Sequence, residues 1–220
     1  ERVVHLPLGV DTRVFRPRES REAVLRELGL EEGVKLLLFV GRFADMKKLP
    51  ALLGCLDELP EDPGPFHLLL VGDGEKRDLV ERAAAERSDV TWVPYVADQD
   101  KLAEIYSAAD LFVNPGTRET FGLVSVEAQA CGTRVLGVRD GGMDETLTGE
   151  QPLILAEEAT PEALAEAVAR IAMIRDSEED RLGRRRRIEA TFSLEHTFDR
   201  LISFYADLKA GRPLDPWFSP

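Results

Sequence analysis

The sequence predicts an α/β fold: a Rossmann-like, doubly wound parallel sheet with extra helices at its C-terminal end. Short apolar segments alternate with amphipathic helical segments along most of the 220 residues, which is typical of a parallel sheet covered by helices on both faces. The apolar segments are nearly continuous, as in strands buried on both sides. Three of them run into Gly41, Gly72 or Asn114. Ligands of such sheets bind at the carboxyl ends of the strands.

The expected strands are short runs of Leu, β-branched and aromatic residues. KLLLFVG and FHLLLVG (35–41 and 66–72) are apolar almost throughout and end in glycine, which is typical of central strands. VTWVPY and DLFVNP (90–95 and 110–115) end at or near proline, which cannot donate to a strand ladder. Two further short strands are expected over residues 133–138 and 152–155.

The expected helices carry apolar residues on one face and charged residues on the other. Residues 161–174 show this pattern most clearly, with a proline at the start. Residues 75–87 have a charged outer face, and residues 47–59 include Pro50, which the first turn of a helix tolerates. Further helices are expected over residues 101–109, 121–130, 178–190 and 194–209.

Composition and charge narrow the class of protein. Hydrophobic residues make up 44% and charged residues 31%, which is typical of a soluble globular protein. The net charge of −13 argues against nucleic acid as a partner, and no apolar run approaches the roughly 20 residues of a membrane span. Cys55 and Cys131 are expected to be buried thiols in a reducing compartment. The chain does not begin with Met, and we expect a fragment of a longer protein.

The stretch PGTRETFG (115–122) leads directly into a predicted helix. Residues 121–123 would then present free backbone N–H groups at a helix N-terminus, which suits a phosphate group. Gly122 would let a ligand approach the backbone closely. Alternatively, Thr117 or Thr120 caps the helix and Gly122 only aids packing.

Two glutamates flank this helix start. Glu127 lies four residues after Leu123, on the same helical face, within a stretch rich in Val and Ala. A carboxylate buried there requires hydrogen-bond donors, and the vicinal hydroxyls of a ribose are suitable. Glu119 precedes the helix and could meet the hydroxyls of a bound sugar. The alternative is a solvated Glu127 and a Glu119 that only complements the helix dipole.

A second group of polar residues follows the first strand. Arg42 and Lys47 could converge on a diphosphate, the former through its planar fork and the latter as a point charge. The alternative is two ordinary surface cations.

Three other motifs point to structure rather than to chemistry. Asp98-Gln99-Asp100 resembles a metal-binding triplet but precedes a helix, so we interpret it as a cap and expect no metal site. Gly72-Asp73-Gly74 is too short for a phosphate-binding loop of the P-loop type. The basic run Arg184–Arg187 is interpreted as a solvated helix face, with contact to a membrane surface as the alternative.

Together these segments resemble the C-terminal, donor-binding domain of a retaining glycosyltransferase with the GT-B fold, in glycosyltransferase family 4. The resemblance covers nearly the whole chain and is most specific over residues 90–145. That part holds an E-x7-E signature at Glu119 and Glu127. It also holds a GG-x-x-E element formed by Gly141, Gly142 and Glu145. The chain departs from the family pattern at Met46-Lys47-Lys48 and at Arg134, where the family usually has proline.

The resemblance implies a role for each matching residue. Arg42 and Lys47 would bind the donor diphosphate with the backbone at Gly122 and Leu123, Glu127 would accept the ribose hydroxyls, and Glu119 would hold the donor sugar. The implied catalytic residues are Glu119, Arg42 and Lys47. The implied donor-binding residues are Gly41, Arg42, Lys47, Pro94, Tyr95, Val96, Glu119, Thr120, Phe121, Gly122, Leu123 and Glu127. The implied ligand is a UDP- or GDP-linked hexose, without a metal or further cofactor.

The resemblance also implies a domain arrangement. Residues 1–17 would be the interdomain linker, residues 18–192 the donor-binding domain, and residues 193–220 a crossing helix and tail. The acceptor domain would precede this chain, so we expect the chain alone to bind nucleotide weakly and to transfer little sugar. We expect a cytoplasmic protein, and leave open that the full-length protein associates peripherally with the inner face of the membrane. Three alternative functions are a nucleotide-sugar binding module, a GT-B sugar-nucleotide epimerase, and a doubly wound binding domain without an enzymatic role.

Overall fold

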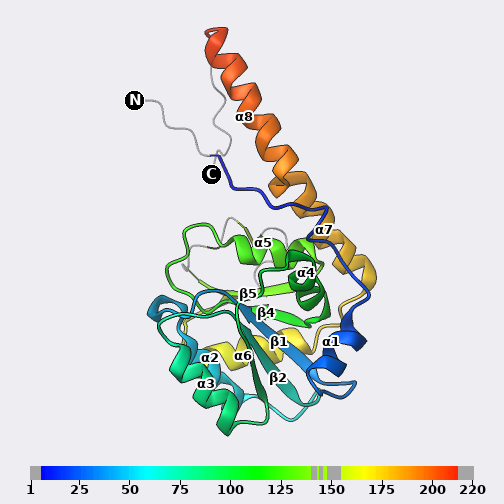
Figure 1. Cartoon of the computed structure of the whole chain (residues 1–220), viewed down its shortest axis with the longest axis vertical. Coiled ribbons are helices and arrows are strands. Elements are labelled where there is room, and N and C mark those ends of the chain that lie inside the picture. Colours follow the sequence, from blue (N-terminus) through cyan, green and yellow to red (C-terminus); the bar gives the residue numbers. More distant parts are fainter. Residues whose placement is uncertain (1–5, 140–142, 144–145, 148–154, 213–220) are drawn as a thin grey trace.

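The computed structural model describes residues 6–139, 143, 146–147 and 155–212 of the chain. Its described strands form one six-stranded sheet in the order β3-β2-β1-β4-β5-β6 (Figure 1). Every neighbouring pair is parallel. The strands are β1 (Lys35–Val40), β2 (Phe66–Val71), β3 (Val90–Val93), β4 (Leu111–Val113), β5 (Arg134–Val138) and β6 (Leu155–Ala156). The predicted doubly wound parallel sheet is confirmed, and its order reverses between β1 and β4.

Helices cover both faces of the sheet because alternate strand residues point to opposite sides. In β1, Leu36 and Leu38 belong to one apolar core and Leu37 and Phe39 to the other. The first core is closed by α1 (Arg21–Glu27), α4 (Gln99–Ala108), α5 (Leu123–Ala130) and α7 (Glu178–Phe192). The second core is closed by α2 (Leu49–Cys55), α3 (Arg77–Glu86) and α6 (Pro161–Ala172). Cys55 and Cys131 are buried free thiols in different cores, as predicted.

Two parts of the predicted helix pattern were wrong. The helix expected over residues 47–59 is three shorter pieces: η1 (Asp45–Lys47), α2 and η2 (Leu56–Glu58). Lys48 has a left-handed backbone with φ of 51°, which interrupts the helix between η1 and α2. Helix α1 was not anticipated, because its seven residues give too short a periodic pattern to detect.

Helix α8 (Leu194–Lys209) projects away from the body of the molecule (Figure 1). The N-terminal segment is joined to its base, because the Val10 amide donates to the Phe192 carbonyl oxygen at 2.8 Å and the Leu194 amide donates to Val10 at 2.9 Å. Beyond this junction the helix exposes large apolar side chains, namely Phe198, Ile202, Tyr205 and Leu208.

The basic run Arg184–Arg187 is a solvated helix face only at Arg186, and the prediction was wrong for Arg184 and Arg185. Arg184 is only 1% exposed, and its guanidinium contacts both carboxylate oxygens of Asp176 at 2.6 Å. Arg185 donates to the carbonyl oxygens of Thr12 and Phe15. These two side chains hold α7 against neighbouring segments, since buried guanidinium groups need such partners.

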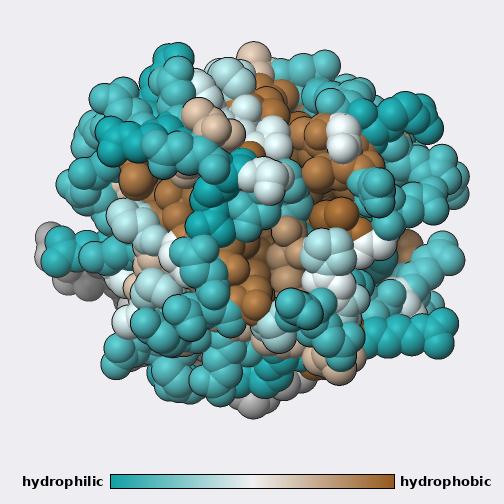
Figure 2. Space-filling view, turned by 90° about the horizontal axis from the view of Figure 1, so that it is seen from below, coloured by the Kyte–Doolittle hydropathy of each residue, from teal (hydrophilic) through white to brown (hydrophobic). Residues whose placement is uncertain are grey.

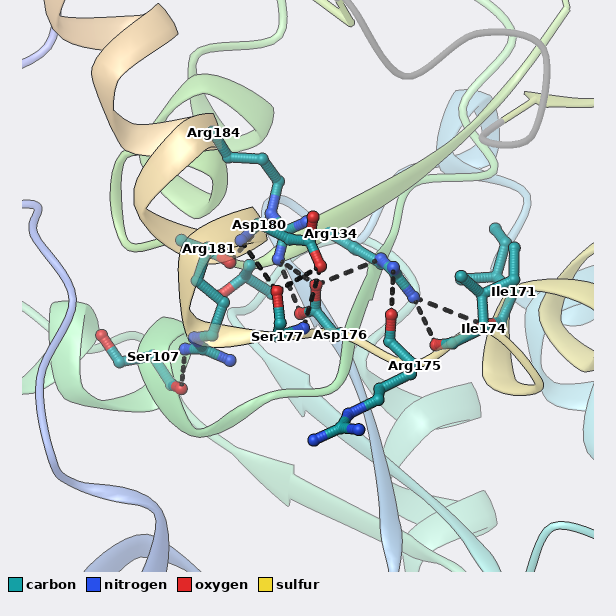
Figure 3. A network of polar contacts seen from close by, with 12 residues as sticks. Ser107, Arg134, Ile171, Ile174, Arg175, Asp176, Ser177, Asp180, Arg181 and Arg184 are labelled. Carbon is teal, nitrogen blue, oxygen red and sulfur yellow. Dashed lines mark hydrogen bonds and ion pairs between the residues drawn. The ribbon is translucent and has the colours of Figure 1, made fainter.

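Arg134 completes this polar network (Figure 3). Its guanidinium donates to the carbonyl oxygens of Ile174 and Arg175 at 2.8 and 3.2 Å and lies 3.5 Å from Asp176. Arg134 therefore stabilises the chain just beyond the C-terminal end of α6, where a proline at this position would donate nothing.

The surface seen from below is mainly hydrophilic, and hydrophobic residues show in the hollows between polar ones (Figure 2). Within the ranges that the structure describes, no helix combines the length and the apolar character needed to cross a membrane.

Candidate functional site

A cavity of about 480 Å³ lies at the carboxyl ends of β1 and β2. Its wall continues through the segment after β3, then through α4 and α5. This is the edge of a doubly wound sheet at which ligands bind. The lining residues are Phe15, Val40, Gly41, Arg42, Val71, Gly72, Asp73, Tyr95, Val96, Ala97, Gln99, Leu102, Val124 and Glu127. The cavity thus brings together five of the predicted site residues: Gly41, Arg42, Tyr95, Val96 and Glu127.

Glycines allow the loops at the cavity floor to pack closely. A Cβ atom on Gly72 would lie 2.0 Å from the Gly41 carbonyl oxygen, and one on Gly74 would lie 2.6 Å from the Phe43 carbonyl oxygen. Gly72 and Gly74 also have φ values of 138° and 155°, which side chains rarely permit. The strand ends can therefore approach each other only because these residues lack side chains.

Glu127 lies in α5 with its carboxylate at the cavity wall. The Tyr106 hydroxyl, from α4, donates a hydrogen bond to Glu127 Oε2 at 2.9 Å. Burial raises the pKa of Glu127 to about 7, although the hydrogen bond from Tyr106 acts in the opposite direction. A protein donor therefore supports one carboxylate oxygen.

Tyr106 was not predicted from the sequence, because only one feature of the sequence indicates its role. Tyr106 is fully buried, with its ring packed edge-on against Phe15 and Phe112. Because a buried tyrosine hydroxyl requires a partner, a tyrosine at an otherwise apolar position of a helix could have indicated a hidden acceptor.

The two predicted cations each face a carboxylate in this structure. Arg42, at the mouth of the cavity, contacts Glu75 at 2.6 Å, and both side chains are largely exposed. Lys47 forms an ion pair with Glu119, and both side chains are mostly buried. Asn114 adds a hydrogen bond to Glu119 Oε2 at 3.2 Å. Lys47 and Glu119 do not line the cavity that contains Arg42.

The start of α5 differs from the alternative in which a threonine caps it. The N-cap is Gly122, with φ of 76°, and no side chain of the described residues caps the helix. A Cβ atom on Gly122 would lie 3.2 Å from both Glu119 and Met143. The first turn therefore keeps backbone N–H groups without a side-chain cap, close to the Glu119 side chain.

The other predicted site residues are scattered around this region. Phe121 is buried with its ring edge-on to Phe192, so it serves the core. Thr120 and Pro94 are exposed, and Leu123 is partly exposed. Gly141, Gly142 and Glu145 lie outside the described residues.

The acidic triplet at residues 98–100 is a helix cap, as predicted. Asp98 Oδ1 accepts from the backbone amides of Asp100 and Lys101 at 2.9 and 3.4 Å. Within the described ranges, no three His, Cys, Asp or Glu side chains are grouped so that they could hold a metal ion.

Chemically, the cavity combines three kinds of surface. Apolar side chains such as Val71 and Leu102 can cover a flat ring, the Glu127 carboxylate can accept hydroxyl groups, and the Arg42 guanidinium at the mouth can meet an anion.

Comparison with known proteins places this geometry in a family. Residues 20–188 match the family described as glycosyl transferases group 1. The chain is 34% identical to the D-inositol 3-phosphate glycosyltransferase of Segniliparus rotundus over 220 residues, which cover 96% of this chain and 48% of that protein. The chain thus spans about half the length of the curated relatives that it matches.

Solved structures show the same fold. Sucrose-phosphate synthase from Thermosynechococcus elongatus aligns with a TM-score of 0.79 and 31% identity, over 94% of this chain and 52% of that one. The C-terminal domain of a glycosyl transferase group 1 protein from Francisella tularensis aligns with a TM-score of 0.66 and 20% identity. This alignment covers 84% of this chain and the whole of that domain. The sheet corresponds to one Rossmann-like half of the GT-B fold, and the chain belongs to the glycosyl transferases group 1 family.

Proposed function

We propose that this chain is the donor-binding half of a retaining hexosyltransferase of glycosyltransferase family 4. It would bind a UDP- or GDP-linked hexose. The observation that carries the proposal is the cavity at the sheet edge, where the Glu127 carboxylate faces a ligand space that also has Arg42 at its mouth. A carboxylate, an apolar wall and a guanidinium match the ribose, base and phosphate of a nucleotide in turn.

In this proposal Glu127 accepts the ribose hydroxyls, and residues 94–96, including Tyr95, border the base. Arg42 exchanges Glu75 for a donor phosphate oxygen. That exchange costs little free energy, because both side chains are largely exposed and exposed ion pairs contribute little to stability.

Lys47 and Glu119 would separate when the donor binds. Lys47 would turn to the diphosphate, and the released Glu119 would accept hydroxyls of the sugar, still supported by Asn114. The uncapped N–H groups that begin α5 would add positive potential beside the diphosphate. Negative charge develops on the diphosphate as the glycosidic bond breaks, and these groups would stabilise it electrostatically without a metal.

The acceptor half is proposed to lie in a separate domain of the longer protein. The relatives' names contain inositol phosphate in one case and sucrose phosphate in another. We therefore confine the proposal to the donor side and expect this chain alone to transfer little sugar.

The test is calorimetric titration of the chain with UDP, GDP and ADP without added metal. We expect one diphosphate to bind selectively, and Glu127→Ala and Arg42→Ala each to weaken its binding by about ten-fold or more. Arg186→Ala is the matched control, since Arg186 is an exposed arginine paired with Glu179 on α7.

Binding that is unchanged in both site variants would contradict the assigned site. Absence of binding by the chain would call for the same titration on the longer protein, which includes the acceptor half. Absence there as well would overturn the proposed function.

A further inference from the structure

A contact behind the cavity wall, between Tyr106 and Glu127, is not used by the proposed roles. Tyr106 is fully buried, its ring packs edge-on against Phe15 and Phe112, and its hydroxyl donates to Glu127 Oε2 at 2.9 Å. The Thr133 hydroxyl donates to the Tyr106 carbonyl oxygen at 2.5 Å, which ties the backbone of α4 to the segment after α5. The tyrosine is therefore held in place by its ring and its backbone, and its hydroxyl is aimed at the carboxylate.

We infer that Tyr106 is a positioning residue for donor binding: its hydroxyl orients the Glu127 carboxylate toward the ribose hydroxyls and favours the ionised form. The inference rests on the proposed function, because it assigns Glu127 to the ribose. Tyr106 itself lies behind the carboxylate and does not line the cavity.

The geometry explains why a fixed donor matters here. A carboxylate has two oxygens with about four acceptor positions. Tyr106 occupies one position on Oε2, so rotation of the carboxylate is restrained and the other positions stay available to the cavity. A free glutamate side chain would instead lose rotamer freedom each time a ligand bound, which weakens binding.

Proton binding provides a second link between Tyr106 and the site. Burial raises the pKa of Glu127 to about 7, and the hydrogen bond from Tyr106 lowers it. Two titratable groups interact with this carboxylate, Tyr106 on α4 and Cys131 just after α5. Arg42, Asp73 and Tyr95 line the same cavity. The thiol of Cys131 stays neutral because burial raises its pKa to about 12.

The sign of the pH dependence follows. An ionised carboxylate accepts from the ribose hydroxyls more strongly than the neutral acid does, so the contribution of Glu127 to nucleotide binding grows as the pH rises through about 7. Binding below that pH releases a proton. Removal of the Tyr106 hydroxyl would move this transition to higher pH, because the hydrogen bond from Tyr106 lowers the pKa of Glu127.

The first test needs no ligand. The Glu127 carboxyl carbon is followed by NMR as a function of pH in the chain, in Tyr106→Phe and in Tyr205→Phe. Tyr205 is an exposed tyrosine on α8, so its variant removes the same hydroxyl at a remote place. We expect a higher titration midpoint in Tyr106→Phe alone. An equal midpoint in all three proteins would overturn the inference.

The second test measures binding of the preferred nucleoside diphosphate to Tyr106→Phe, Glu127→Gln and the double variant. The pH is varied from about 5.5 to about 8.5, on either side of the Glu127 pKa of about 7. At neutral pH we expect roughly ten-fold weaker binding in Tyr106→Phe, with no further loss when Glu127→Gln is already present. Glu127→Gln also reports the pH dependence that comes from the nucleotide itself.

The outcomes separate the two proposals. Normal binding by the unchanged chain together with equal loss from Tyr106→Phe in both backgrounds would overturn the positioning role and leave the proposed function intact. Failure of every form to bind nucleotide, in this chain and in the longer protein, would overturn the proposed function, while the NMR midpoint would still decide whether Tyr106 controls Glu127.

Discussion

At the scale of single residues, Glu127 is the member of the candidate site whose ionisation is most affected by burial. The carboxylate is buried at a cavity wall with Tyr106 as its protein donor, and burial raises its pKa to about 7. Functional sites often hold ionisable groups whose pKa values are shifted by burial, at a cost in the stability of the folded state. Without ligand, the ionised Glu127 is therefore expected to oppose folding.

We predict that Glu127→Gln stabilises the chain at pH 8. The folded-state pKa of about 7 lies above the ordinary value of 4.5, so the folded chain holds the proton more tightly than the unfolded chain. The contribution of Glu127 to the free energy of unfolding is complete below pH 4.5 and is lost as the pH rises to about 7. The amide lacks this loss, so the variant should gain up to roughly 3 kcal/mol at pH 8.

Urea unfolding of both proteins at pH 4.5 and pH 8 measures this difference. The gap should be small at the lower pH and large at the higher one. A gap that does not change with pH would show that Glu127 titrates normally in the folded chain.

We predict that Gly72→Ala disrupts the cavity floor. The added Cβ atom would lie 2.0 Å from the Gly41 carbonyl oxygen, at a backbone φ of 138°. We expect a loss of more than about 2 kcal/mol in the free energy of unfolding, because backbone strain and a clash with main chain add together.

Gly183→Ala is the matched control for this substitution. Gly183 lies inside α7, and the nearest atom to an added Cβ is Arg187 Nη1 at 3.8 Å. Alanine favours helix by about 1 kcal/mol over glycine, so this variant should be more stable than the unchanged chain. Equal effects of the two alanines would contradict the close approach of the strand ends.

At the scale of elements, α7 is attached by arginines rather than by apolar packing alone. Arg184 joins it to Asp176, while Arg185 reaches the N-terminal segment. Asp176 is shared with Arg134, which also holds the segment after α6 (Figure 3). One carboxylate therefore links α7 and the segment between α6 and α7 to β5.

We predict that Arg184→Ala lowers the free energy of unfolding by about 3 kcal/mol, because it leaves Asp176 without its buried partner. Thermal and urea unfolding measure the loss. Arg186→Ala should change stability by less than about 0.5 kcal/mol, since Arg186 and Glu179 are both exposed. Similar effects of the two substitutions would mean that the buried Arg184–Asp176 ion pair contributes no more to the free energy of unfolding than an exposed ion pair.

At the scale of the whole molecule, α8 extends from the body (Figure 1). It carries a stripe of exposed apolar residues, namely Phe198, Ile202, Tyr205 and Leu208. The N-terminal segment meets the base of the same helix through Val10 and Ser193. The curated relatives are about twice as long as this chain. We propose that the acceptor half of the longer protein packs on this stripe.

We predict that Ile202→Ser together with Tyr205→Ser leaves the stability of the isolated chain unchanged to within about 0.5 kcal/mol, because these side chains are about two-thirds exposed, at 64% and 65%. In the longer protein, the same pair should lower the melting temperature and the rate of sugar transfer. Strong destabilisation of the isolated chain would show instead that α8 packs on this body.

The fold and much of the site followed from local patterns. Continuous apolar runs such as KLLLFV predicted buried parallel strands, and the polar residues at their ends predicted the edge where the cavity lies. Glu119, Arg42 and Glu127 could be predicted as candidate site residues, because a short motif depends on residues that are near each other in sequence or that follow strand ends.

Only the tertiary structure decided which partner each polar side chain meets. Tyr106 and Glu127 are 21 residues apart, and Lys47 and Glu119 are 72 residues apart. Periodicity describes one segment at a time, whereas these contacts depend on how separate helices and loops pack against the sheet. The sequence by itself thus determined the sheet and the edge at which the cavity lies, and packing decided that a buried tyrosine supports the carboxylate and that each predicted cation pairs with an acid.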